Sequence, residues 1–260
     1  MILHELAAYA KARVAHAKET KSAEDIRAEA LRLPKGDFRF ERALKRSRAA
    51  LICEVKKASP SKGVIAEDFP YLQIARDYQA GGADCISCLT EPKWFLGSDT
   101  IFREIRGAVS LPMLRKDFTV DEYQLYEAKA MGADAVLLIC ALLSQNTIAR
   151  YLAVCDGLGI SALVEAHDAA EIASASEAGA RVIGVNNRNL QDFSVNFDNA
   201  GALRRLIPPG AVFVAESGVR TPADVAALRA AGADAVLVGE ALMRSTDRRA
   251  AVAAFLEAAG

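Results

Sequence analysis

The segment Glu-Val-Lys-Lys-Ala-Ser-Pro-Ser-Lys-Gly (54–63) holds the densest group of chemically active side chains in the sequence. It follows a short apolar run, residues 50–53, that is typical of a buried strand. Glu54 and Lys56 lie two residues apart, so on a strand their side chains point to the same side. A buried charge is costly unless it is paired, so this is either an inert ion pair or a functional acid and cation. Ser59 and Pro60 would add a hydroxyl and a rigid turn near an anionic ligand.

The segment Arg-Lys-Asp-Phe (115–118) follows another apolar run, residues 111–114. A lysine at the end of a core strand can act as a general acid, as an anchor for an anion or as a Schiff-base nucleophile. We expect Asp117 to hold the ammonium of Lys116, and the ring of Phe118 suits an aromatic substrate. An ordinary salt bridge is the alternative interpretation.

Glu165 ends the apolar run at residues 162–164 and is a candidate general base. His167 follows two residues later, and on a strand it would face the same side. A histidine at a strand-to-helix joint is more often a capping or packing residue. We therefore leave His167 out of the predicted site.

Three later strand ends carry polar or glycine-containing segments. Asn-Asn-Arg-Asn-Leu (186–190) provides groups that can orient a sugar hydroxyl or a carboxylate. Glu-Ser-Gly (216–218) and Val-Gly-Glu (238–240) end the last two predicted strands, where many barrels bind phosphate through backbone N–H groups. Glycine lets the backbone approach the phosphate oxygens closely. We predict a phosphate site there, followed by a short helical segment at residues 240–243.

The elements that must position these residues alternate regularly along the chain. This alternation predicts an α/β fold, a single (β/α)8 TIM barrel, in which catalytic residues collect at the carboxyl ends of the strands. The predicted strands are residues 50–53, 86–89, 111–114, 135–139, 162–164, 182–185, 212–215 and 235–238. The predicted helices are residues 71–80, 100–108, 121–131, 146–155, 168–178, 199–206 and 221–231, and a last helix that Ser245 or Thr246 caps.

The length of 260 residues suits one barrel domain, which takes about 250 residues. We predict an N-terminal helical extension at residues 1–48, with two helical segments, and the barrel at residues 49–260. The loop at residues 56–70 is long enough to suggest a function. A weak repeat, Gly-Ala-Asp or Gly-Ala-Arg, recurs at residues 82–84, 132–134, 179–181 and 232–234. Its glycine is expected to end a helix in the left-handed conformation.

Composition excludes several classes of partner. A formal net charge of -1 argues against nucleic acid. No apolar stretch approaches the ~20 residues of a membrane span, and no export signal is visible, so we expect a cytoplasmic protein with reduced thiols. Cys85 and Cys88 would point to opposite faces of a strand, which favours structural thiols over a redox or zinc site. We find no convincing metal-ligand pattern and predict no metal and no cofactor.

Taken together, these segments resemble the indole-3-glycerol-phosphate synthase family of tryptophan biosynthesis. The likeness extends from the N-terminal helix to the end of the sequence, and the order and spacing of the segments make it more specific than any one motif. Besides the segments at 54–63 and 115–118, the matching stretches are residues 89–98, 163–167, 183–190, 216–219 and 238–243.

The resemblance implies a barrel whose N-terminal extension lies over the catalytic mouth. It implies a carboxy-lyase that needs no cofactor and converts 1-(2-carboxyphenylamino)-1-deoxyribulose 5-phosphate to indole-3-glycerol phosphate, releasing carbon dioxide and water. By resemblance Lys116 is the general acid, Glu165 the general base of the dehydration, and Lys56 the partner of the substrate carboxylate. Positioning residues would be Glu54, Asn186, Arg188, Glu216 and Ser217; the apolar walls Pro60, Phe95, Phe118 and Leu190; and the phosphate cradle Gly218, Gly239 and Glu240, with Lys56 and Ser59 as helpers.

Two departures and three rival interpretations remain. The first helix, with Ile2-Leu3-His4-Glu5-Leu6, lacks the aromatic residue that some members place over the substrate, and we expect no second enzyme fused to this barrel. The rivals are phosphoribosylanthranilate isomerase, a Schiff-base aldolase using Lys116, and an inactive barrel that only binds a phosphorylated ligand or a protein. We expect a monomer that binds a small phosphorylated substrate, with a weak dimer as the alternative.

Overall fold

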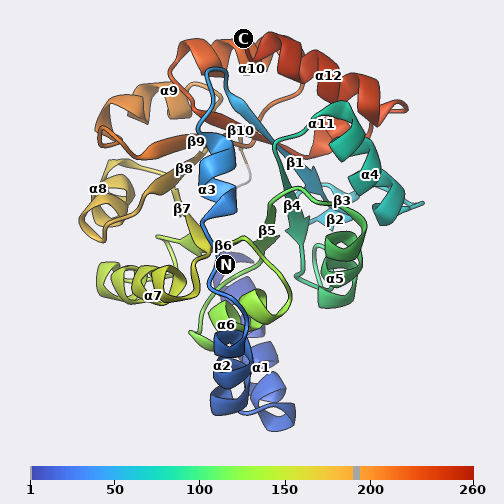
Figure 1. Ribbon diagram of the computed structural model, residues 1–260. Helices are drawn as coiled ribbons and strands as arrows, with labels where there is room; N and C mark the ends of the chain where they lie inside the picture. The colour runs from blue at the N-terminus through green and yellow to red at the C-terminus, as the bar shows by residue number, and fades with distance from the viewer. Residues whose placement is uncertain (1, 190–193) are drawn as a thin grey trace.

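Eight parallel strands close into a barrel in the computed structural model, which describes residues 2–189 and 194–260 (Figure 1). Each strand pairs with its neighbour in the sequence, and β1 pairs with β10 to close the ring. All eight predicted strands are confirmed. They are β1 (Ala50–Val55), β4 (Cys85–Leu89), β5 (Met113–Lys116), β6 (Ala135–Ile139), β7 (Ser161–Ala166), β8 (Val182–Asn186), β9 (Val212–Glu216) and β10 (Ala235–Val238).

Helices surround the barrel, as predicted, although most boundaries differ by one to three residues, and α7 continues to Leu158 rather than ending at residue 155. Helix α6 begins at Tyr123 rather than at residue 121, because the side chain of Asp121 accepts a hydrogen bond from the Tyr123 N–H at 2.8 Å. The cap of α12 is Asp247, which accepts from Ala250 N–H at 2.9 Å, so the predicted caps were wrong. The helices are α4 (Tyr71–Gly81), α5 (Asp99–Ala108), α6 (Tyr123–Ala130), α7 (Gln145–Leu158), α8 (Ala169–Glu177), α9 (Asn199–Leu203) with the 3-10 turn Arg204–Leu206, α10 (Pro222–Ala230), α11 (Glu240–Met243) and α12 (Arg248–Ala258).

The glycine repeat marks the amino-terminal end of the barrel. All four glycines are left-handed, at φ between 84° and 94°, as expected for residues that end a helix. In three copies the aspartate that follows accepts a hydrogen bond from a backbone N–H near the start of a neighbouring strand. These bonds join Asp84 to Leu51, Asp134 to Met113 and Asp234 to Phe213, at 2.8–2.9 Å.

The N-terminal extension contains three helices, not the predicted two: α1 (Ile2–Thr20), α2 (Ala23–Arg32) and α3 (Arg39–Leu44). Helix α3 lies at the centre of the ring in Figure 1, and α1 and α2 lie beside α6. Phe40 and Leu44 of α3 are fully buried against the side chains that fill the barrel. The extension therefore closes the amino-terminal end of the barrel, while its first residues reach the opposite end.

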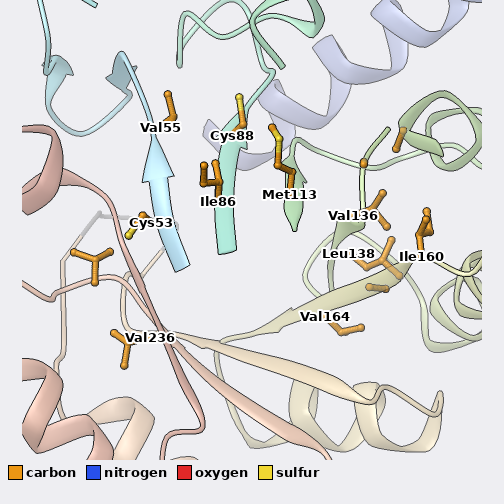
Figure 2. Close-up of a cluster of buried hydrophobic side chains, with 14 of the residues drawn as sticks. Cys53, Val55, Ile86, Cys88, Met113, Val136, Leu138, Ile160, Val164 and Val236 are labelled. Carbon is orange, nitrogen blue, oxygen red and sulfur yellow. The ribbon is translucent and has the colours of Figure 1, made fainter. Parts of the chain in front are cut away.

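Alternate strand residues pack to opposite sides of the barrel wall. Cys53, Val55, Ile86 and Cys88 point outward into the layer between strands and helices (Figure 2), whereas Cys85 belongs to the barrel interior. Burial raises the pKa of each of these thiols, so they are protonated and unreactive. Because Cys85 packs inside the barrel and Cys88 packs outside it, the prediction that they face opposite sides of the strand is confirmed.

The long loop after β1 is not structureless. It contains a small antiparallel hairpin of β2 (Ala58–Ser59) and β3 (Gly63–Val64), and the Ala58 N–H donates to the carbonyl of Phe95 at 3.2 Å. No helix in the described part of the chain is long and apolar enough to cross a membrane.

Candidate active site

A cavity of about 770 Å³ opens at the carboxyl ends of the barrel strands. Fifteen of the sixteen predicted site residues line it, and they come from almost every strand of the barrel. The remaining one, Leu190, lies outside the described residues. The fifteen are Glu54, Lys56, Ser59, Pro60, Phe95, Lys116, Phe118, Glu165, Asn186, Arg188, Glu216, Ser217, Gly218, Gly239 and Glu240.

Glu54 and Lys56 face the same side and form an ion pair, with Nζ of Lys56 at 2.5 Å from Oε1 of Glu54. The other carboxylate oxygen accepts a weak hydrogen bond from Ser87 at 3.5 Å. Burial alone would raise the pKa of Glu54, but the positive charges of Lys56 and Lys116 outweigh it and the pKa is lowered. Glu54 is therefore an ionised group that holds Lys56 in place.

Lys116 lies at the centre of the carboxylates. Its Nζ is 3.7 Å from Oε2 of Glu165 and 3.8 Å from Oε2 of Glu216. Burial acts to lower the pKa of Lys116, but Glu165, Glu216 and Glu54 outweigh it, so the pKa lies above the usual lysine range. The side chain is a protonated ammonium at neutral pH, as a general acid must be.

Asp117 does not hold Lys116, contrary to our expectation. Its carboxylate accepts hydrogen bonds from Arg13 at 2.6 and 3.1 Å and from Thr90 at 2.6 Å. Adjacent residues at a strand end point to opposite sides, so Asp117 faces α1 while Lys116 faces the cavity. The partners of Lys116 are glutamates from other strands, which its own segment could not reveal.

Glu216 is buried, and neither of its carboxylate oxygens has a hydrogen-bond donor within the described residues. Burial, followed by repulsion from Glu165, raises its pKa from 4.5 to about 8. The 3.8 Å approach of Lys116 would favour the ionised form. We give more weight to the absence of donors, because an ionised carboxylate without hydrogen bonds is costly to bury, and infer that Glu216 holds a proton at neutral pH.

His167, which the sequence reasoning excluded, contacts the predicted base. Its Nε2 is 3.4 Å from Oε1 of Glu165, and its Nδ1 is 3.0 Å from Oε2 of Glu171 on α8. Burial lowers its pKa, but the hydrogen bond to Glu171 and the charge of Glu165 outweigh it, so the pKa is raised. His167 therefore packs between Glu165 and Glu171. The two-residue spacing between Glu165 and His167 in the sequence was the signal that both side chains face the same side.

The ends of β9 and β10 form the part of the cavity where phosphate binding was predicted. Ser217 and Gly218 are both left-handed, at φ of 65° and 93°, which turns the chain sharply after β9. Glu240 begins α11 and pairs with Arg244 at 3.0 Å and with Lys62 at 3.8 Å. Sequence reasoning named Lys62, with Ser59, only as an alternative phosphate contact and did not include Arg244 or Arg220, although all three line the cavity.

Apolar side chains line another part of the cavity. The rings of Phe95 and Phe118 lie 6.1 Å apart, centre to centre. Ile2, Leu3 and Leu6 of α1 also face the cavity. The sequence did not decide whether α1 would reach the cavity, because its first residues include no aromatic side chain. Helix α1 therefore contributes an aliphatic wall.

The arrangement joins an acid, a base and an apolar surface in one enclosed space. No group of three or more histidine, cysteine or carboxylate side chains in the described ranges could hold a metal ion. The neighbouring ammonium of Lys116 and carboxylate of Glu165 could transfer protons to and from a bound molecule.

The chain matches the family described as indole-3-glycerol phosphate synthase over residues 3–255. Three similar proteins bear that name. The protein from Ruminiclostridium cellulolyticum is 54% identical, covering 97% of this chain and 98% of its own length. The one from Endomicrobium trichonymphae is 51% identical, covering 94% and 95%. The one from Lacticaseibacillus paracasei is 48% identical over 100% of both chains.

Among solved structures, the thiamine phosphate pyrophosphorylase from Pyrococcus furiosus is similar in fold. Its TM-score is 0.63 at 16% sequence identity, and the match covers 85% of this chain and 97% of that one. At this identity the likeness shows the barrel fold alone.

Proposed function

This chain belongs to the indole-3-glycerol phosphate synthase family, and on that premise we propose which residues carry out its reaction. The enzyme is a carboxy-lyase of tryptophan biosynthesis. It closes the ring of 1-(2-carboxyphenylamino)-1-deoxyribulose 5-phosphate to give indole-3-glycerol phosphate, with loss of carbon dioxide and water. One observation carries the assignment of roles: the ammonium of Lys116 lies between Glu165 and Glu216 inside the cavity.

The first step is ring closure. Lys116 donates its proton to the ketone oxygen of the substrate, which makes the carbonyl carbon more open to attack. The aromatic carbon that bears the carboxylate attacks it, and a carbon–carbon bond forms. Loss of carbon dioxide then returns the bonding electrons to the ring and restores its aromaticity.

The second step is dehydration. Glu165 removes a proton from the methylene carbon next to the nitrogen, and the former ketone oxygen leaves as water. That oxygen needs a second proton, which Lys56 or Lys116 supplies. The complete reaction therefore takes up one proton from solvent, balancing the negative charge of the carboxylate that leaves as carbon dioxide.

The remaining residues bind and orient the substrate. Lys56, held by Glu54, binds the substrate carboxylate. The aromatic part lies against the apolar walls formed by Pro60, Phe95 and Phe118. The other polar groups orient the sugar chain and bind the phosphate, the latter through backbone N–H groups at the ends of β9 and β10. These groups are Ser59, Asn186, Arg188, Ser217, Gly218, Gly239 and Glu240.

We propose that the enzyme works in the cytoplasm as a monomer, without a metal or other cofactor. Full activity after exhaustive dialysis against EDTA, and a single monomeric species in sedimentation, would support this. Activity that returns only when a metal is added would contradict it.

Replacing Lys116 by alanine tests the assignment of the general acid. Lys116→Ala should lower kcat by about 100- to 10,000-fold, the range for loss of an acid–base group, while substrate binding persists. Indole-3-glycerol phosphate formation is followed by the fluorescence of the indole ring. Lys116→Arg should not restore activity, because a guanidinium holds its proton too tightly.

Two outcomes would contradict the proposal. A Lys116→Ala enzyme with most of the wild-type kcat would remove Lys116 from the acid role. Trapping of substrate on Lys116 by borohydride would instead indicate Schiff-base chemistry, as in an aldolase.

A further inference from the structure

Gly184 lies in the middle of the buried strand β8, where glycine is an unusual residue. A glycine inside a strand lacks a side chain to pack and weakens the strand. Its φ is not in the left-handed region, so the backbone here does not require glycine. The reason for glycine must be the space that a side chain would fill.

That space is occupied by Glu216. A Cβ atom at Gly184 would collide with Oε1 of Glu216 and would lie 3.2 Å from Cδ of the same carboxyl group. It would also lie 3.1 Å from Cδ1 of Leu163. Gly184 is the register partner of Glu165 on β7, and Glu216 reaches this level from β9. The missing side chain therefore leaves room between the strands that carry Glu165 and Glu216.

We propose that Gly184 is a positioning residue, whose missing side chain makes room for the Glu216 carboxylate beside Lys116 and Glu165. This rests on the roles proposed above for Lys116 and Glu165. A similar collision would occur at the end of β10. A Cβ atom at Gly239 would lie 2.5 Å from Oε1 of Glu54 and 3.0 Å from Nζ of Lys56. Glycine thus stands where each of these two buried carboxylates approaches the barrel backbone.

The carboxylate of Glu216 would have to move if position 184 carried a side chain. It is buried, and it lies 3.8 Å from Nζ of Lys116. Any such movement changes the distance between Glu216 and Lys116, and therefore the electrostatic environment of the Lys116 ammonium.

Gly184→Ala should lower kcat by about 100-fold, the effect of an error of about 1 Å in a catalytic group. KM should change much less than kcat, because the groups that bind the substrate stay in place. The pH dependence of kcat should shift as well, since Glu216 leaves its buried position beside Glu165. The matched control is Gly157→Ala, which adds a methyl group at an exposed position of α7 with nothing within 4 Å. Its kcat should equal that of the wild type.

A double-mutant cycle identifies Glu216 as the main cause. Gly184→Ala should lower the melting temperature of the wild type, and this loss should be much smaller in a Glu216→Ala background, where only the 3.1 Å contact with Leu163 remains. This readout does not depend on activity, so it tests the inference even if the proposed catalytic roles fail. In a Glu216→Asp background, with its shorter side chain, Gly184→Ala should lower kcat by less than in the wild type.

The same cycle applies if Gly184→Ala does not fold. Recovery of folding on adding Glu216→Ala would support the inference, and failure to recover would overturn it. An equal loss of melting temperature in both backgrounds would also overturn it, as would a Gly184→Ala enzyme with the wild-type kcat and pH profile.

Discussion

At the scale of single residues, the cavity holds one ammonium among three carboxylates in different states. Glu54 is paired with Lys56 and has a lowered pKa, whereas Glu216 is buried without a hydrogen-bond donor among the described residues and has a pKa raised to about 8. Their environments separate their pKa values, because a nearby cation lowers one and burial raises the other. Divergent pKa values among neighbouring carboxyl groups are a mark of acid–base chemistry.

Glu165→Gln keeps the shape of the side chain and removes its ability to take up a proton. We expect kcat to fall by about 100-fold or more with little change in KM, as for loss of a general base. The measurement is steady-state kinetics over a range of pH, where the variant should also lose one limb of the profile. An unchanged profile would assign the base to another carboxylate, with Glu54 the first to test.

Glu216 should make stability depend on pH. Its pKa rises from 4.5 to about 8 on folding, so between these values the folded protein binds a proton that the unfolded chain has released. The contribution of this group to the free energy of unfolding is therefore fully present below the lower value and is lost as pH rises through the upper one. Glu216→Gln cannot ionise, so it should remove this loss.

The measurement compares urea unfolding of wild type and Glu216→Gln at about pH 5 and about pH 9. The free energy of unfolding of Glu216→Gln minus that of the wild type should be larger at about pH 9 than at about pH 5. Glu257→Gln, at an exposed position of α12, serves as the control and should show no such change. A difference between wild type and Glu216→Gln that is the same at both pH values would contradict the raised pKa.

At the scale of elements, the loops after the strands line much of the cavity. Gly218 follows β9 in a left-handed turn, and a Cβ atom there would lie 2.9 Å from Cγ1 of Val195. A side chain would therefore strain the turn as well as approach the proposed phosphate site. These two effects have to be separated by experiment.

Gly218→Ala should raise KM for the phosphorylated substrate and weaken inorganic phosphate as a competitive inhibitor. Strain should lower stability by about 1–2 kcal/mol, the cost of a left-handed non-glycine residue. Gly210→Ala is the matched control, since Gly210 has φ of 91° with nothing within 4 Å. It should lower stability in the same way and leave KM unchanged. If a dephosphorylated substrate analogue loses as much from Gly218→Ala as the substrate does, the phosphate lies elsewhere.

At the scale of the whole molecule, the N-terminal extension links the two ends of the barrel. Ile2, Leu3 and Leu6 of α1 line the cavity, while α3 closes the opposite end. Between them, Arg13 of α1 is fixed to Asp117, directly beside Lys116 and Phe118. The extension is thus part of the folded barrel and of the cavity wall together.

Phe40→Ala should separate stability from catalysis. Phe40 is 0% exposed and packs into the amino-terminal end of the barrel, so its truncation should cost about 3–5 kcal/mol of unfolding free energy. Below the melting transition kcat should stay near the wild-type value, because the substitution lies at the end away from the cavity. Leu33→Ala, at a side chain that is 41% exposed, should cost far less. A large loss of kcat in folded Phe40→Ala would show that the two ends are coupled.

The sequence by itself determined the barrel, its eight strands and fifteen of the residues that line the cavity. The physical reason is local: apolar runs, glycine ends and the alternation of strand side chains depend on the backbone of a few neighbouring residues. Barrel closure then brings the carboxyl ends of all strands together. The family followed from the order and spacing of the same segments.

Only the tertiary structure decided which side chains meet. Asp117 pairs with Arg13, 104 residues away, rather than with its neighbour Lys116. Glu216 has its raised pKa because the fold buries it and places it beside Glu165. Such pairings depend on strand register and on how the extension packs against the barrel. No local pattern encodes these, because the partners come from separate elements that become neighbours only when the chain folds.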